Sequence, residues 1–173
     1  LINIESVTQT GKGVYVAVLD TGLVPNWRDY FPEARIATHL GAGFHQSVSF
    51  KAKKDTCGLG IEVGALRTES WVGSRGSTHG THVASLVAQV APGARIMPVR
   101  VLDAQGVGNV WVLAEGLLHA VDPDRNPTSD DGAKVINLSL GTLRPTQLLA
   151  DIIEAMSCGD DYDDDDDDND PDK

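Results

Sequence analysis

The alternation of apolar runs with helical repeats constrains the fold of this chain most. Residues 14–19 read V-Y-V-A-V-L, a continuous apolar run with β-branched residues that is typical of a strand buried on both faces of a parallel sheet. Similar runs predict strands at 95–102 and 135–140. Helical spacing predicts helices that begin near His79 and Asn109. Strands and helices in this order predict an α/β fold with parallel βαβ units and right-handed crossovers.

The apolar positions predict which face of each helix is buried. We expect a helix from His79 to be buried along one stripe, a second helix to be capped by Asn109, and a third to run from Pro145 to about Met156. The expected inward residues are Val83, Leu86, Val87 and Val90, then Val110, Leu113, Leu117 and Val121, then Leu148, Leu149, Ile152 and Ile153.

The intervening residues 37–75 are rich in glycine and show weak periodicity. We expect them to form a surface excursion, with a short strand near residues 61–66. Within the strand at 95–102, Pro98 counts against a regular central strand, although a bulge or an edge would tolerate it.

The chain has 173 residues, which favours one domain, and a net charge of −11. Residues 160–173 contain ten Asp and one Lys, so the remainder carries only −2. Such a nearly neutral body offers no basic patch for nucleic acid, and no apolar run reaches membrane-spanning length. The acidic tail is low-complexity and predicted to be disordered. Cys57 and Cys158 could pair or stay free.

His79 stands where a tight glycine-bearing loop opens onto a helix, between Gly76 and Gly80. Histidine can accept a proton near neutral pH, so this position suits a general base. A lone histidine that fills a helix start would be the simpler interpretation. A second candidate residue upstream favours the general-base interpretation instead.

That second site is Asp20, which ends the first predicted strand and precedes a Thr-Gly turn. Functional groups in open α/β sheets gather at the carboxyl ends of the strands. An aspartate there could accept the Nδ1 proton of a histidine and stabilise the imidazolium that forms. A turn aspartate that caps the next segment is the alternative.

These stretches resemble the subtilisin-like serine peptidases, the subtilase family. The matching words are V-A-V-L-D-T-G around Asp20, H-G-T-H-V-A around His79, and V-I-N-L-S-L-G at 135–141, in the family's order. The resemblance implies a three-layer α/β fold, with a mainly parallel sheet flanked by helices, that is incomplete at its C-terminus. Residues 1–159 would then be a partial catalytic domain, and 160–173 the tail. Asp20 would be the triad acid and His79 the triad base, with His82 a structural neighbour.

The resemblance also implies a polypeptide substrate, bound as an extended strand along the cleft. The substrate-binding residues that it implies are Gly106, Val107, Gly108, Ser139, Leu140 and Gly141. The missing C-terminal half of the domain would be a further partner. A secreted or extracellular protein is expected, although no signal peptide is visible.

The family's remaining catalytic words are absent. A serine peptidase needs a nucleophilic serine and an oxyanion donor, which the family supplies from G-T-S-x-A and A-G-N-like words. Neither occurs in this sequence, so we expect residues 1–173 alone to be an inactive fragment of a serine endopeptidase.

No cofactor is required for this chemistry, and no metal site is predicted. By resemblance, Asp29 could be a ligand of a structural calcium ion, but a solvated loop carboxylate is the favoured interpretation. His79 and His82 lack the i, i+4 spacing and the intervening Glu of a helical zinc motif.

Two other functions remain open at this point. A pseudo-protease or peptide-binding module would have kept the cleft and lost the chemistry. An aspartic peptidase would also explain the apolar-apolar-Asp-Thr-Gly word, but that class is all-β and needs two such aspartates to meet.

Overall fold

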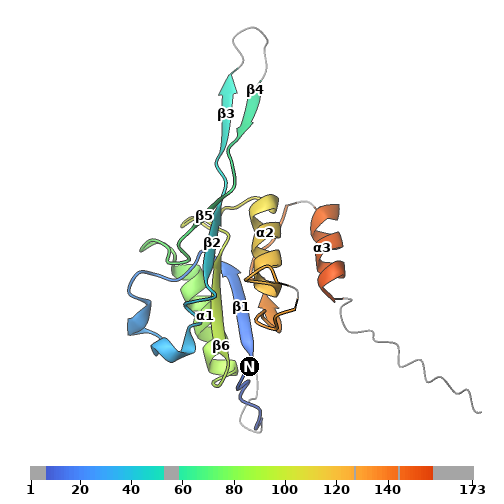
Figure 1. The fold of residues 1–173 in the computed structure, drawn as a ribbon. Helices are drawn as coiled ribbons and strands as arrows, with labels where there is room; N and C mark the ends of the chain where they lie inside the picture. Colours follow the sequence, from blue (N-terminus) through green and yellow to red (C-terminus); the bar gives the residue numbers. More distant parts are fainter. Residues whose placement is uncertain (1–6, 53–58, 127, 144, 158–173) are drawn as a thin grey trace, which may run out of the picture.

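The computed structural model describes residues 7–52, 59–126, 128–143 and 145–157. Its main sheet has the strand order β5-β2-β6-β1-β7 (Figure 1). The strands β2, β6, β1 and β7 are parallel, and β5 pairs antiparallel with β2 at one edge. These strands are β1 (Tyr15–Asp20), β2 (Ala42–His45), β5 (Arg67–Glu69), β6 (Arg95–Arg100) and β7 (Val135–Asn137). The predicted α/β class with a mainly parallel sheet is confirmed.

Helices cover the sheet on both faces, as the three-layer prediction requires (Figure 1). Helix α1 (Thr78–Val90) packs on one face, and α2 (Val110–Val121) packs on the other. Helix α3 (Gln147–Ser157) lies outside against α2. Two single-turn 3-10 helices, η1 (Trp27–Asp29) and η2 (Glu33–Arg35), follow β1.

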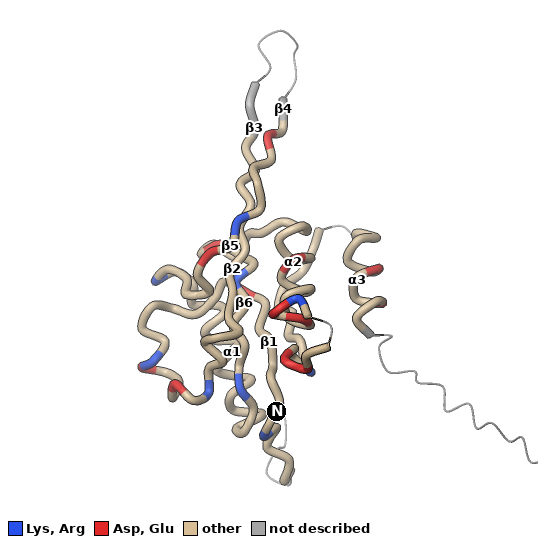
Figure 2. The backbone as a smooth tube through the Cα atoms, in the orientation of Figure 1, with Lys and Arg blue, Asp and Glu red and all other residues tan. Residues whose placement is uncertain are grey.

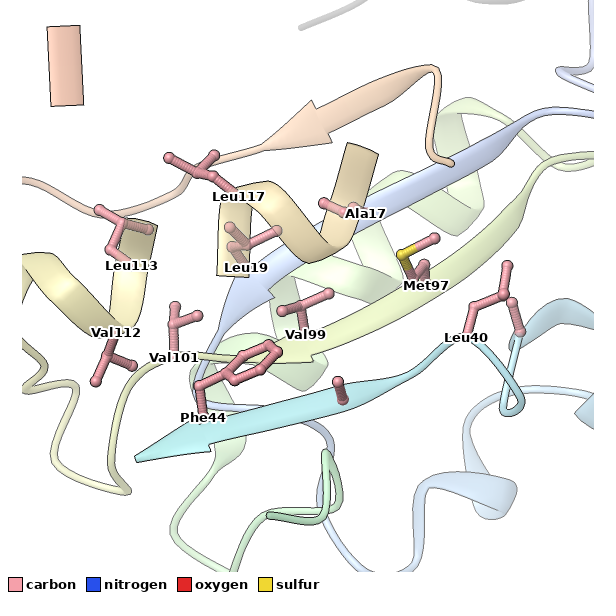
Figure 3. Close-up of a cluster of buried hydrophobic side chains, with 13 residues drawn as sticks. Ala17, Leu19, Leu40, Phe44, Met97, Val99, Val101, Val112, Leu113 and Leu117 are labelled. Carbon is pink, nitrogen blue, oxygen red and sulfur yellow. The ribbon is translucent and has the colours of Figure 1, made fainter. Parts of the chain in front are cut away.

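Alternate residues of β1 reach the two cores. Ala17 and Leu19 belong to the cluster under α2, while Val18 belongs to the cluster under α1. Figure 3 shows Leu19 between the strands and α2, close to Leu113 and Leu117. Because both faces of β1 are buried, its sequence is continuously apolar rather than alternating.

Parts of the predicted helix faces are wrong. Val83 is buried in α1, but Leu86 and Val90 are exposed, and Val121 at the end of α2 is exposed too. The buried face of α1 is formed instead by Gly80, Thr81, Val83 and Ala84. Since these side chains are small and lie in the first half of the helix, α1 approaches the sheet most closely near His79.

The stretch 37–75 is not only a surface excursion. It supplies β2, which pairs with β6 inside the main sheet and buries Ala42 and Phe44. The expected strand near residues 61–66 is found in part as β4 (Leu59–Val63), which ends at Val63, and β5 starts only at Arg67. The four residues A-G-F-H are too few to show a strand period, so no pattern in the sequence predicts β2.

Strands β3 (Val48–Ala52) and β4 form a separate two-stranded antiparallel sheet. Their register places Val48 opposite Val63 and Ser49 opposite Glu62. Figure 1 shows this β3–β4 hairpin standing out beyond the end of the main sheet.

Pro98 lies in β6, the middle strand of the main sheet, in register with Val18 of β1. Pro98 is therefore in a central strand rather than at an edge, but the pairing of that strand with β2 is not regular at this position. On the opposite side of β6, Ile96 accepts a hydrogen bond from the Ala37 N–H, and regular pairing with β2 starts only at Val99. Proline has no backbone N–H to donate to a neighbouring strand. At position 98 this donor is not needed, because the hydrogen-bond ladder between β6 and β2 is interrupted there.

No described helix is long and apolar enough to cross a membrane. Figure 2 shows the Lys and Arg residues scattered over several elements rather than gathered on one face. The predictions for Cys57, Cys158 and the acidic tail at 160–173 concern residues outside the described ranges.

Candidate active site

Asp20 ends β1 at the carboxyl edge of the sheet, with only 1% of its surface exposed. The Thr21 backbone N–H donates a hydrogen bond to its Oδ1 at 2.7 Å. A buried carboxylate needs such donors, because its charged oxygens have lost water. This hydrogen bond from Thr21 therefore holds the Asp20 carboxylate in place independently of His79.

His79 lies in the first turn of α1 and meets this carboxylate from across the fold. Its Nδ1 is 2.9 Å from both Oδ1 and Oδ2 of Asp20, which is hydrogen-bond distance. An ionised carboxylate can only accept, so Nδ1 carries the proton, and in the neutral ring Nε2 then has a free lone pair. The His79 side chain is 57% exposed, and no described residue is hydrogen-bonded to its Nε2. The pair thus presents a proton-accepting nitrogen to the outside.

Two buried threonines connect the end of β1 to the start of α1. The Gly80 N–H donates to Thr21 Oγ1 at 3.0 Å. Thr81 Oγ1 accepts from the Val24 N–H and donates to the Ser77 carbonyl. Sequence reasoning missed both threonines, although each belongs to a quoted motif, D-T-G or H-G-T-H.

Gly80 makes this close approach possible. A Cβ at this position would lie 2.5 Å from the Gly22 carbonyl oxygen and 3.1 Å from Asp20 Oδ1. Any side chain would push α1 away from the end of β1 and separate His79 from Asp20.

The first set of predicted substrate-binding residues, Gly106, Val107 and Gly108, lies in the loop after β6. Asp103 Oδ1 accepts the N–H groups of Gln105 and Val107, and Gly106 has a φ of +80°, a conformation that favours glycine. Val107 and Gly108 line a cavity of about 680 Å³ that also touches Ser77, two residues before His79. Hydrogen bonds to Asp103 therefore hold this loop, and the loop borders a cavity that reaches the residue just before α1.

The second set, Ser139, Leu140 and Gly141, follows β7. Ser139 and Gly141 are exposed, whereas Leu140 packs partly buried against the core under α2. Ser139 Oγ donates to Asn137 Oδ1 at 2.8 Å. Since β1, β6 and β7 are parallel neighbours, Asp20 at the end of β1 and the two predicted sets after β6 and β7 all lie at the carboxyl edge of the sheet.

The carboxylates that could bind a cation lie elsewhere. Asp29 accepts a hydrogen bond from the Asn26 side chain in an exposed turn. Asp122, Asp124 and Asp131 bring carboxylate oxygens within 4.8 Å of one another in the loop after α2. All three accept hydrogen bonds from Asn126 or Ser129, so this loop has its own internal partners.

Together these features define an α/β protein whose mainly parallel sheet presents a buried aspartate and an exposed histidine at its carboxyl edge. The model of the Subtilase family matches residues 11–172. The chain belongs to the subtilase family.

Several curated relatives agree with this assignment. Subtilisin Savinase of Lederbergia lenta is 32% identical over 155 residues, which cover 84% of this chain and 44% of that protein. An alkaline protease of Alkalihalobacillus alcalophilus shows the same identity over 84% of this chain and 31% of its own length. Thermitase of Thermoactinomyces vulgaris is 42% identical over 76 residues, 38% of this chain and 24% of that protein. The chain thus spans less than half the length of these relatives.

Proposed function

We propose that this chain is the acid–base part of a serine-type endopeptidase. The observation that carries the proposal is the Asp20–His79 pair, with Nδ1 at 2.9 Å from both carboxylate oxygens and an exposed ring. Membership of the subtilase family and the proteases among the relatives support the reaction class.

The proposed chemistry assigns one task to each residue. His79 Nε2 takes the proton of a serine hydroxyl as that oxygen attacks the peptide carbonyl, and later gives it to the leaving amine. Asp20 fixes the tautomer of His79 and stabilises the imidazolium. Burial of Asp20 strengthens this electrostatic effect, because water does not screen it.

The serine itself has no candidate in residues 1–173. Neither G-T-S-x-A nor an A-G-N-like word occurs in them. Ser77 is buried and accepts the Ser74 N–H, and Ser139 is bonded to Asn137. We therefore propose that residues 1–173 alone are inactive and that the nucleophile and the oxyanion donor come from a further segment of the domain.

We propose that the substrate is a polypeptide, bound as an extended strand between Gly106–Val107–Gly108 and Ser139–Leu140–Gly141. In these two segments every residue except Leu140 is exposed at the carboxyl edge, which supports pairing of this kind. The same missing segment would be the partner of β7. Strand β7 is at one edge of the main sheet, and both its first residue, Val135, and Leu143 in the segment after it are exposed.

The remaining parts of the proposal concern cofactors and location. The chemistry needs no cofactor. If a structural calcium ion binds, the oxygens of Asp122, Asp124 and Asp131 are ligands of the kind that it prefers. We propose a secreted or extracellular location, no nucleic-acid partner and no membrane partner.

The test uses the full 173-residue chain with a fluorogenic peptide and a fluorophosphonate probe. We expect no turnover and no labelled serine. With the following segment of the parent gene restored, peptide hydrolysis should appear, and His79→Ala should reduce kcat by about 10⁴-fold or more. His82→Ala is the matched control, since His82 is exposed on the same helix and should have little effect.

Two outcomes would contradict the proposal. Stoichiometric labelling of the 173-residue chain, with turnover abolished by His79→Ala, would mean that it contains its own nucleophile. A parent gene without a G-T-S-x-A word would favour a pseudo-protease or peptide-binding module. The aspartic-peptidase alternative is already wrong, because the fold is α/β with a mainly parallel sheet rather than all-β.

A further inference from the structure

The start of α1 has an unusual arrangement of hydrogen bonds. The first N–H groups of any α-helix have no partner within the helix and are normally satisfied by a side chain at the residue just before it. Here that residue is Ser77, a good capping type, yet its side chain makes no capping bond to the helix. Ser77 Oγ instead accepts the Ser74 N–H in the preceding loop.

The missing cap comes from another part of the fold. Gly80 is the third residue of α1, and its N–H donates to Thr21 Oγ1 at 3.0 Å, from 59 residues away in sequence. Thr21 is 1% exposed, so water cannot replace this bond. The hydroxyl of Thr21 therefore does for α1 what an N-cap side chain does elsewhere.

This cap joins the two halves of the acid–base pair. Thr21 follows Asp20 directly and binds its Oδ1 through the backbone N–H, while Gly80 follows His79 directly. We infer that Thr21 is a positioning residue, which caps α1 from the strand and thereby sets the distance between Asp20 and His79. The inference rests on the roles proposed above for that pair.

Thr81 offers a natural comparison. Its hydroxyl is also buried and also connects α1 to the segment after β1, through the Val24 N–H and the Ser77 carbonyl. It does not bind a residue adjacent to His79 or Asp20. Loss of the Thr81 hydroxyl should therefore affect stability, but not the geometry of the pair.

The experiment uses the full chain with ¹⁵N-labelled histidine. In the wild type, the Nδ1 proton of His79 should give a low-field NMR resonance with slow solvent exchange, because it is bound to a carboxylate. Thr21→Val removes the hydroxyl at nearly constant shape and should abolish or broaden this resonance. Thr21→Ser should restore it, and Thr81→Val should leave it in place. An unchanged His79 resonance in Thr21→Val would overturn the inference, as would its loss in Thr81→Val alone.

A second measurement needs no variant and so does not depend on whether Thr21→Val folds. The Gly80 amide of the wild type should exchange with solvent about tenfold more slowly than the His79 amide of the same first turn, which has no acceptor among the described residues. Equal exchange rates would mean that Thr21 does not cap α1. Neither measurement requires peptide hydrolysis. The inference about Thr21 can therefore be wrong while the peptidase proposal holds, and the peptidase proposal can be wrong while the inference about Thr21 holds.

Discussion

The two β-sheets of this chain differ in what covers them. In the main sheet, the central strands β1 and β6 lie between α1 on one face and α2 on the other, and residues such as Leu19 and Ile96 are fully buried. In the β3–β4 hairpin, Val48, Ile61 and Val63 are all exposed. Both sheets contain β-branched residues, so local composition alone does not separate them.

This difference shows which part of the molecule can hold catalytic side chains in precise positions. Burial of apolar side chains on both faces stabilises β1 and β6, whereas an isolated two-stranded hairpin is only marginally stable in water. Asp20 belongs to the first kind of structure and sits at the end of its best-packed strand. We expect substitutions in the two sheets to have very different effects on unfolding.

The largest effect should come from Leu19→Ala in β1. Leu19 is fully buried under α2 and precedes Asp20, so its truncation leaves a cavity in the core (Figure 3). The free energy of unfolding should fall by about 2–5 kcal/mol, measured by urea denaturation followed by circular dichroism. A loss below about 1 kcal/mol would show that the core under α2 collapses to fill the space.

A smaller effect is expected at the start of α2, the helix that covers this face of the sheet. Asn109 Oδ1 accepts the N–H groups of Trp111 and Val112, both at 3.0 Å. Asn109→Ala should lower the free energy of unfolding by about 1 kcal/mol in the same assay. Asn109→Asp keeps the capping oxygen and should retain most of the stability. Equal losses in the two variants would exclude capping as the cause.

The smallest effect should come from Ile61→Thr in the β3–β4 hairpin. Ile61 is 65% exposed, and threonine has a similar preference for strands. The free energy of unfolding should change by no more than about 0.5 kcal/mol. Ile96→Thr in β6 is the matched control. Ile96 is fully buried, so the introduced hydroxyl would lose its hydrogen bonds to water, which destabilises the fold. Similar losses for the two variants would contradict the distinction between the sheets.

The sequence by itself determined β1, β6 and the starts of α1 and α2. Continuous apolar runs and helical spacing are local signals, because burial on both faces or on one stripe appears directly in the order of residues. The words around Asp20 and His79 also placed the two residues of the candidate site. Their meeting followed from a strand end and a helix start that face the same edge of a parallel sheet.

The tertiary structure alone decided which segments complete this arrangement. Strand β2 forms because β6 and β5 pair with it on its two sides, and its own four residues carry no strand period. The buried half of α1 is set by close contact with the sheet, which selects Gly80 and Ala84 over the larger Leu86 and Val90. The bond from Gly80 to Thr21 joins residues 59 positions apart. Pairings of this kind depend on packing between distant segments, and no window of the sequence contains both partners.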